Sequence, residues 1–138
     1  MGGGERIKEK VKKAIPCLLT AAATVCACFL FVAVLLRPQP LHIGTVDLDT
    51  VADGAYIGVC QNKILFAVVK VEVQNHQITS IEIVEHKDAY MEQAEQIAGA
   101  VCSEQSLEVD AVSGATLTSD TVLKAIENAL EDAASNRK

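Results

Sequence analysis

The stretch that decides the fold reads Asp110-Ala111-Val112-Ser113-Gly114-Ala115-Thr116-Leu117-Thr118-Ser119 and runs directly into an amphipathic segment, residues 120–133. Apolar residues recur at helical spacing along that segment: Val122, Leu123, Ile126, Leu130 and Ala133. We therefore predict a helix with one buried face, with Thr118 or Ser119 as its N-cap and Asp120 in its first turn.

The residues before this helix are small, flexible or hydroxyl-bearing, which suits the binding of an anion. A helix N-terminus leaves four N–H groups unpaired and carries roughly half a positive charge, so a phosphate finds both donors and a favourable dipole there. Gly114 and Ala115 let the main chain approach a ligand closely, and Thr116 and Thr118 offer hydroxyl groups. The alternative interpretation is an ordinary loop followed by a capping signal.

The string Asp-x-x-Ser-Gly-Ala-Thr at 110–116, followed by Thr-Ser and a patterned helix, resembles the FMN-binding domain family. That family includes the covalent-flavin subunits of the sodium-pumping NADH:quinone oxidoreductase and of the Rnf complex, and extracytoplasmic flavoproteins of bacterial respiratory chains. In these proteins a flavin transferase uses FAD to join the FMN phosphate to the threonine that ends the motif, through a phosphoester bond. The resemblance covers roughly residues 53–133 and implies covalent attachment at Thr116. It implies cofactor contacts at Asp110, Ser113, Gly114, Ala115, Leu117 and Thr118.

Two further positions match the family in part. Family members often carry a histidine after the second hairpin strand, followed by a Thr-Pro-Gly segment near the flavin. Here His86 matches the histidine, but the residues that follow lack the Pro and the Gly. His86 is therefore either a hydrogen-bond partner beside the isoalloxazine or a plain surface histidine. Tyr56 resembles part of the family's opening strand and also fits a half-buried strand tyrosine.

The N-terminal part of the 138-residue chain has the composition of a membrane anchor. Residues 1–13 form a basic tail, and residues 14–36 contain no charge and are long enough to span a bilayer, with Pro16 in the first turn. The positive-inside rule then predicts a cytoplasmic N-terminus and a single-pass protein with its C-terminal domain outside the cytoplasm. A cleaved signal peptide is the alternative, although the apolar run exceeds the usual signal-peptide core.

Residues 37–50 are predicted to be a linker that begins with Pro38-Gln39-Pro40, and residues 51–138 to be the extracytoplasmic domain. From His42 onward the chain is acidic, so nucleic acid is not an expected partner. Residues 55–60, 63–74 and 78–83 have strand patterns with a turn at Asn75-His76, and residues 90–101 are predicted to form an amphipathic helix. The predicted fold is α+β: a small antiparallel sheet packed with two helices.

Cysteines and other ligating residues give weaker indications. Cys17, Cys26 and Cys28 fall in the apolar run and are expected to be small apolar residues there. Cys60 and Cys102 fall in the domain, where the compartment permits a disulfide but spacing alone does not establish one. No ligand spacing in the sequence predicts a metal site.

The resemblance implies a membrane-anchored flavoprotein that transfers electrons, and it favours an electron-transfer protein or redox-complex subunit over a stand-alone enzyme, although enzyme activity stays open. Its expected partners are a flavin transferase for maturation and a membrane dehydrogenase or the subunits of a redox complex. Two alternatives remain open: an accessory subunit of a larger membrane redox complex, and a module of the same fold that binds another ligand or partner without flavin.

Overall fold

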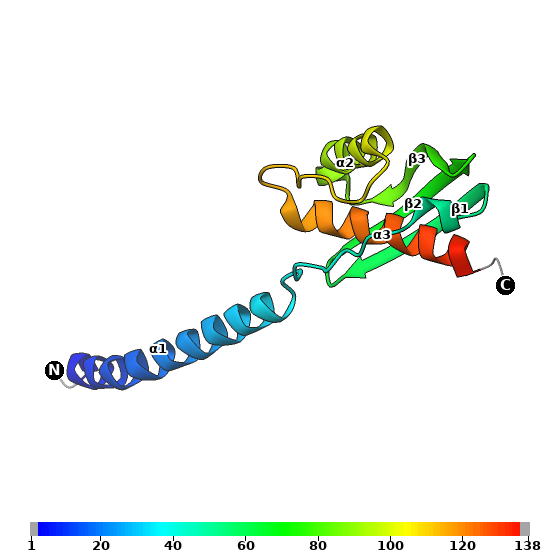
Figure 1. Cartoon of the computed structure of the whole chain (residues 1–138). Helices are drawn as coiled ribbons and strands as arrows, with labels where there is room; N and C mark the ends of the chain where they lie inside the picture. Colours follow the sequence, from blue (N-terminus) through cyan, green and yellow to red (C-terminus); the bar gives the residue numbers. More distant parts are fainter. Residues whose placement is uncertain (1–2, 136–138) are drawn as a thin grey trace. The chain divides into compact units, whose positions relative to one another are not determined.

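The computed structural model describes residues 3–135 and divides the chain into two compact units, Met1–Arg37 and Pro38–Lys138 (Figure 1). In the first unit, helix α1 spans Gly3–Leu35 and therefore begins in the basic tail, well before residue 14. Pro16 consequently lies inside the helix, which corrects the prediction that it occupies the first turn.

Helix α1 is long and apolar enough to cross a membrane, with a mean hydropathy of 2.6 over its most apolar window. Its two central threonines satisfy their hydroxyl groups within the helix. The Thr20 hydroxyl donates to the Cys17 carbonyl at 2.9 Å, and the Thr24 hydroxyl donates to the Ala21 carbonyl at 2.8 Å. Length and composition are what this helix shares with membrane spans, and an N-terminal signal sequence shares them too.

The second unit contains a three-stranded antiparallel sheet in the order β1-β2-β3. The strands are β1 (Gly54–Asn62), β2 (Leu65–Gln74) and β3 (Gln77–His86). The central strand β2 alternates strictly: Ala67, Val69, Val71 and Val73 are fully buried. The β2–β3 turn consists of Asn75 and His76, both with positive φ, as the sequence predicts.

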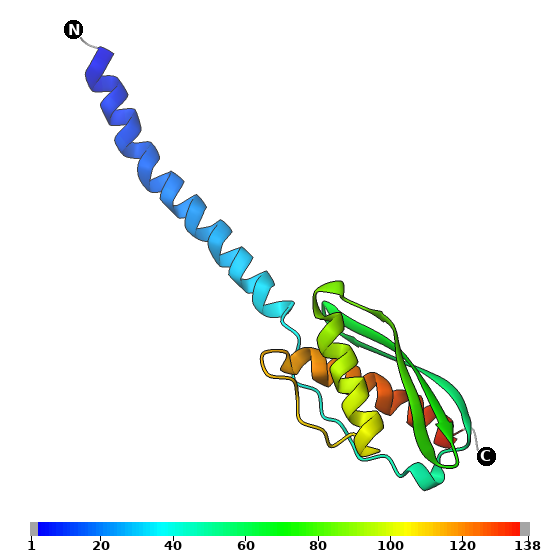
Figure 2. The same ribbon diagram turned by 90° about the horizontal axis from the view of Figure 1, so that it is seen from above.

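Two helices cover one face of this sheet, as Figure 2 shows. Helix α2 (Met91–Glu104) packs against β3, and helix α3 (Thr116–Ser135) packs against β1 and β2. Short 3-10 turns, η1 (Leu48–Thr50) and η2 (Asp88–Tyr90), precede β1 and α2. The α+β prediction of a small antiparallel sheet packed with two helices is confirmed.

Contact between α3 and the sheet depends on Gly58. A Cβ atom at this position would lie 1.9 Å from the Ala125 carbonyl oxygen and 2.8 Å from the Ala129 nitrogen. Only a residue without a side chain therefore lets the helix backbone come this close to β1.

The segment before β1 is packed onto the domain. Leu41, Ile43, Val46 and Leu48 lie against the core, and Val51 is fully buried. The Gln39 main chain exchanges two hydrogen bonds with the Asn62 side chain, at 3.0 and 2.6 Å. Residues 38–50, predicted to be a linker, are thus part of the compact unit Pro38–Lys138.

A single side chain joins the end of α2 to the start of β3. Gln105 adopts a left-handed conformation with φ 53°, which ends the helix. Its side-chain amide accepts a hydrogen bond from the Ile78 N–H at 2.7 Å and donates to the Ile78 carbonyl at 2.8 Å. Gln105 therefore satisfies both backbone groups of Ile78, as a neighbouring strand would.

Cys60 and Cys102 are both free thiols. Cys60 lies on β1, whereas the Cys102 thiol donates to the Ile78 carbonyl of β3, two strands away. Strands are spaced about 4.8 Å apart, so this separation exceeds the Cα distance of about 7 Å that a disulfide tolerates. Burial raises the pKa of the Cys60 thiol.

Candidate functional site

The Ser-Gly-Ala-Thr motif forms a tight turn that leads directly into α3. The Ala115 N–H donates to the Val112 carbonyl at 2.9 Å, and Gly114 has a φ of +80° at the third position. A type II turn requires a positive φ there, which explains the glycine. A Cβ atom at Gly114 would meet nothing within 4 Å, so the space above this glycine is open.

Ser119 holds this turn in place from inside the helix. Its hydroxyl donates to the Ala115 carbonyl at 3.0 Å and accepts from the Val112 N–H at 3.1 Å. Ser119 is fully buried, so both hydrogen bonds are shielded from water. The loop that carries the motif is therefore fixed at both ends of the turn.

Helix α3 begins at Thr116, which corrects the predicted start at Thr118 or Ser119. Thr118 and Ser119 are buried inside the first turns and are not N-caps, and Asp120 lies beyond the first turn. The physical reason is the Ser119 hydroxyl, which bonds to the preceding turn and lets the helix extend back to the motif. Thr116 thus lies at the helix N-terminus with its side chain exposed.

A depression of about 430 Å³ lies over this helix start. Its floor is the motif itself, from Gly114 to Thr118. Its walls come from elements distant in the sequence: Pro38, Ile64, Leu65, Lys87 and Tyr90.

The predicted cofactor residues separate into two groups. Gly114, Ala115, Thr116, Leu117 and Thr118 line the depression together. Asp110 and Ser113 are exposed on the loop before it and are not among the lining residues.

His86 is buried, which excludes the surface alternative, while a role beside the flavin stays a prediction. It is 5% exposed, so it is not a surface histidine, and its Nδ1 lies 2.6 Å from the Phe66 carbonyl. A carbonyl can only accept, so Nδ1 carries the proton, and Nε2 is a buried nitrogen without a hydrogen-bond partner among the described residues. His86 is not among the lining residues, whereas the next residue, Lys87, is one of them.

Sequence reasoning missed the wall residues. Pro38 was assigned to a linker and Tyr90 to the start of a helix, while Ile64 lies in the β1–β2 turn and Leu65 begins β2. Lys87 alone had a usable signal, because cations are rare in this acidic half of the chain.

Charges near the depression favour an anionic ligand. Lys70 and Lys124 are engaged elsewhere: each donates a 2.6 Å hydrogen bond to a carboxylate, Glu72 and Glu127 respectively, which raises the pKa of both lysines. Within residues 38–135, Lys63 and Lys87 are the cations without an ion pair. Lys87 lines the depression beside the positive end of the α3 dipole.

This arrangement fits a phosphorylated flavin. The first N–H groups of α3 and the exposed Thr116 hydroxyl suit a phosphate, and the open space at Gly114 permits its approach. Ile64, Leu65 and Tyr90 offer apolar and aromatic surface for a ring system. Among residues 3–135 no group of three or more His, Cys, Asp or Glu could hold a metal ion.

Residues 66–131 match the family model described as FMN-binding domain. The match covers β3, α2, the whole motif and most of β2 and α3. It agrees with the resemblance inferred from the motif and supports FMN as the cofactor. No curated protein matches the chain.

Proposed function

We propose that this protein is a membrane-anchored flavoprotein that carries FMN covalently on Thr116 and transfers electrons outside the cytoplasm. The observation that carries the proposal is the exposed Thr116 hydroxyl at the first position of α3, directly after a turn that Gly114 leaves open. This hydroxyl lies at the lining of a depression large enough for a cofactor.

The attachment step follows from the chemistry of a hydroxyl group. The Thr116 oxygen attacks the phosphorus on the FMN side of FAD, the anhydride bond between the two phosphates breaks, AMP leaves, and the hydroxyl loses its proton. A flavin transferase catalyses this exchange. The unpaired N–H groups at the start of α3 then face the phosphoester, and Lys87 adds positive charge.

Covalent attachment suits a shallow site outside the cytoplasm. A cofactor lost there could not be replaced by cytoplasmic synthesis, and tethering removes the translational and rotational cost of binding. The bound isoalloxazine supplies the electron chemistry, while the protein supplies position and electrostatic surroundings.

The anchor and its orientation follow from α1 and its flank. Arg6, Lys8, Lys10 and Lys12 precede the apolar part of α1, so the positive-inside rule places the N-terminus in the cytoplasm and the FMN-binding domain on the opposite side. The electron partners we propose are a membrane dehydrogenase or the subunits of a membrane redox complex.

The decisive variant is Thr116→Val, which removes the hydroxyl but keeps the shape of the side chain. We expect it to abolish attachment when the protein is co-expressed with a flavin transferase. Intact mass, with a gain of one FMN less water in the wild type, and in-gel flavin fluorescence after denaturation measure this. Because Thr116 is exposed, the free energy of unfolding should change by less than about 0.5 kcal/mol.

Two controls accompany it. Thr116→Ser keeps a hydroxyl and should retain attachment, although at a reduced rate. Thr118→Val alters a buried threonine two residues away and should reduce attachment far less. Equal loss in the Thr116→Val and Thr118→Val proteins, or an unmodified wild type despite an active transferase, would contradict the proposal.

A further inference from the structure

The two turns at the ends of β2 differ in how well their residues suit a turn. Asn75 and His76 form the β2–β3 turn with residues that tolerate or accept a positive φ, and the His76 N–H donates to Asp53 at 3.3 Å. The β1–β2 turn instead contains Lys63, with a φ of 59°, followed by Ile64. Glycine or asparagine would suit the first position better, and a β-branched apolar residue has no advantage in an exposed turn.

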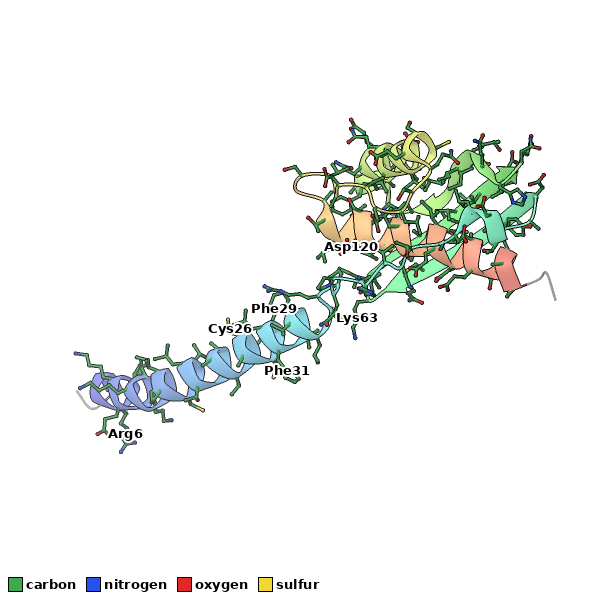
Figure 3. The ribbon with its side chains drawn as sticks, in the orientation of Figure 1. Arg6, Cys26, Phe29, Phe31, Lys63 and Asp120 are labelled. Carbon is green, nitrogen blue, oxygen red and sulfur yellow. The ribbon has the colours of Figure 1, made fainter. Side chains whose placement is uncertain are left out.

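Ile64 is only half-buried, at the edge of the depression, and Lys63 has no side-chain partner in the described part of the domain. The Ile64 side chain is 50% exposed, and no hydrogen bond or ion pair of the Lys63 side chain occurs in the described part of the domain. Figure 3 shows the Lys63 side chain extending from the turn. A turn that breaks local preference without an internal benefit points to an external contact.

The charge of the domain singles out the same place. Six Lys and Arg against sixteen Asp and Glu give residues 38–138 a formal charge of −10. Its two cations without an ion pair within residues 38–135 are Lys63 and Lys87, one in this turn and the other in the wall of the depression that Ile64 also lines. Among the side chains that the structure describes in this acidic domain, the cations without an ion pair thus lie in the wall of the depression and in the adjoining turn.

Tyr90 completes a set of side chains typical of membrane interfaces. It is 39% exposed and lines the depression together with Ile64 and Lys87. Tyrosine is enriched at the headgroup level of bilayers, lysine extends its ammonium group toward anionic headgroups, and isoleucine enters the acyl boundary.

Chain connectivity limits the distance between Pro38 and the apolar segment. Pro38 lines the same depression, and only Arg37 separates it from Leu36 at the end of the apolar run. An extended residue spans at most about 3.6 Å, so this end of the domain stays within reach of the bilayer surface that the anchor enters.

We propose that Lys63, Ile64, Lys87 and Tyr90 form a membrane-contact rim that docks on the surface of a bilayer containing anionic phospholipid. The inference rests on the proposed membrane anchoring and specifies which end of the domain meets the lipid. Ile64 and Tyr90 enter the interface, and the two lysines contact headgroup phosphates, which attract basic residues near an anionic surface.

The sequence contains no tryptophan, so a single introduced tryptophan reports on its own surroundings. We would reconstitute the full chain with Tyr90→Trp, an aromatic exchange that does not create the contact, into phosphatidylcholine–phosphatidylglycerol vesicles. The measurement is the ratio of tryptophan emission in acyl-brominated and unbrominated lipid. The matched control is Gln77→Trp, at the exposed start of β3 and about 30 Å away along β2.

We expect bromination to quench the reporter at 90 at least about twofold, since interfacial residues lie within 5–10 Å of the acyl boundary, and to leave the reporter at 77 unchanged. Adding Ile64→Ser or Lys63→Gln to the Tyr90→Trp protein should lower the quenching, whereas Lys70→Gln, which removes an ion-paired charge on the sheet, should not. Lys63→Gln should lower the quenching only in vesicles that contain phosphatidylglycerol.

Equal quenching at 90 and 77, or no effect of Ile64→Ser and Lys63→Gln, would overturn the rim. Intact mass of the same samples reports flavin attachment independently. A protein that carries FMN but shows no quenching at 90 refutes the rim alone, and a quenched protein without FMN refutes the attachment alone.

Discussion

Gly58 and Gly99 show how differently the same residue type serves this domain. Gly58 lies where α3 crosses β1, and a Cβ atom there would overlap the Ala125 carbonyl oxygen. Gly99 lies on the exposed side of α2, where a Cβ atom would meet nothing within 4 Å. The first glycine is required by packing, and the second only weakens its helix.

We therefore expect Gly58→Ala to lower the free energy of unfolding by about 3 kcal/mol, because neither backbone can yield without moving the helix. Gly99→Ala, the matched control, should raise it by about 0.5–1 kcal/mol. Urea unfolding of the full chain in detergent measures both. Similar behaviour of the two variants would mean that α3 does not approach β1 as closely as described.

The motif residues illustrate what a local sequence pattern can and cannot predict. The pattern correctly grouped Gly114, Ala115, Thr116, Leu117 and Thr118, because neighbours in a turn and one helical turn are necessarily close. It did not find Pro38, Ile64, Lys87 and Tyr90, because they reach the site through strand pairing and chain return. It also did not predict the burial of His86, since one histidine at a strand end has no periodic signal that indicates burial.

Among the elements, α3 carries a clamp that ties the segment after Pro38 to the domain. Glu127 is 4% exposed, accepts a 3.0 Å hydrogen bond from the Gly44 N–H, and pairs with Lys124 at 2.6 Å. The hydrogen bond to Glu127 raises the pKa of the Lys124 ammonium above its ordinary 10.5. One carboxylate thus fixes both a lysine and the incoming chain.

Glu127→Ala should lower the free energy of unfolding by about 2 kcal/mol, since it removes two hydrogen bonds to a charged group and leaves the Gly44 N–H unpaired. Glu131→Ala, on the exposed side of the same helix, should stay within about 0.5 kcal/mol of the wild type. Denaturant titration measures both changes.

The contribution of the Lys124–Glu127 ion pair to the free energy of unfolding decreases at high pH. Because the folded pKa of Lys124 is raised, the stabilisation from its ion pair is fully present below pH 10.5 and is lost as the pH rises through the folded pKa. The stability difference between wild type and Glu127→Ala should therefore narrow above pH 10.5, with the part due to Gly44 remaining. If the stability difference between the two proteins did not change with pH, the ion pair with Lys124 would not contribute to it.

The regular elements were predictable because their signals are periodic. Alternation in β2 and the helical spacing in α2 and α3 each define one buried face, and the sheet and both helices follow from that. The segment from Pro38 to residue 53 packs through single contacts such as Gly44 to Glu127, which join residues 83 positions apart and leave no local pattern. The start of α3 was misplaced for a related reason: Thr118 and Ser119 are good N-caps by type, but the Ser119 hydroxyl serves the preceding turn.

At the scale of the whole molecule, charge is divided unevenly along the chain. Residues 1–37 have six basic and two acidic residues, against six and sixteen in the remainder. Five of the six basic residues of the first part precede the apolar run, and the positive-inside rule is the basis for the proposed orientation with the N-terminus in the cytoplasm.

This orientation predicts the outcome of cysteine labelling in intact cells. A membrane-impermeant maleimide should label Gln77→Cys without permeabilisation and Lys8→Cys only after it, since both positions are exposed but lie in different units. The wild type provides the background labelling: three of its cysteines lie in the apolar helix, and the other two are buried or half-buried. Labelling of Lys8→Cys in intact cells would mean that the N-terminus lies outside the cytoplasm. Release of the labelled domain from the membrane would indicate a cleaved signal peptide.

The hydrogen bonds of Ser119 to Val112 and Ala115 bear on the order of events during biogenesis. A loop that its own helix already holds in shape does not wait for a ligand to become ordered. Under the proposed attachment, the transferase would meet Thr116 in a domain that is already folded. Attachment of FMN would then be the last step of maturation, and its extent would follow the supply of FAD.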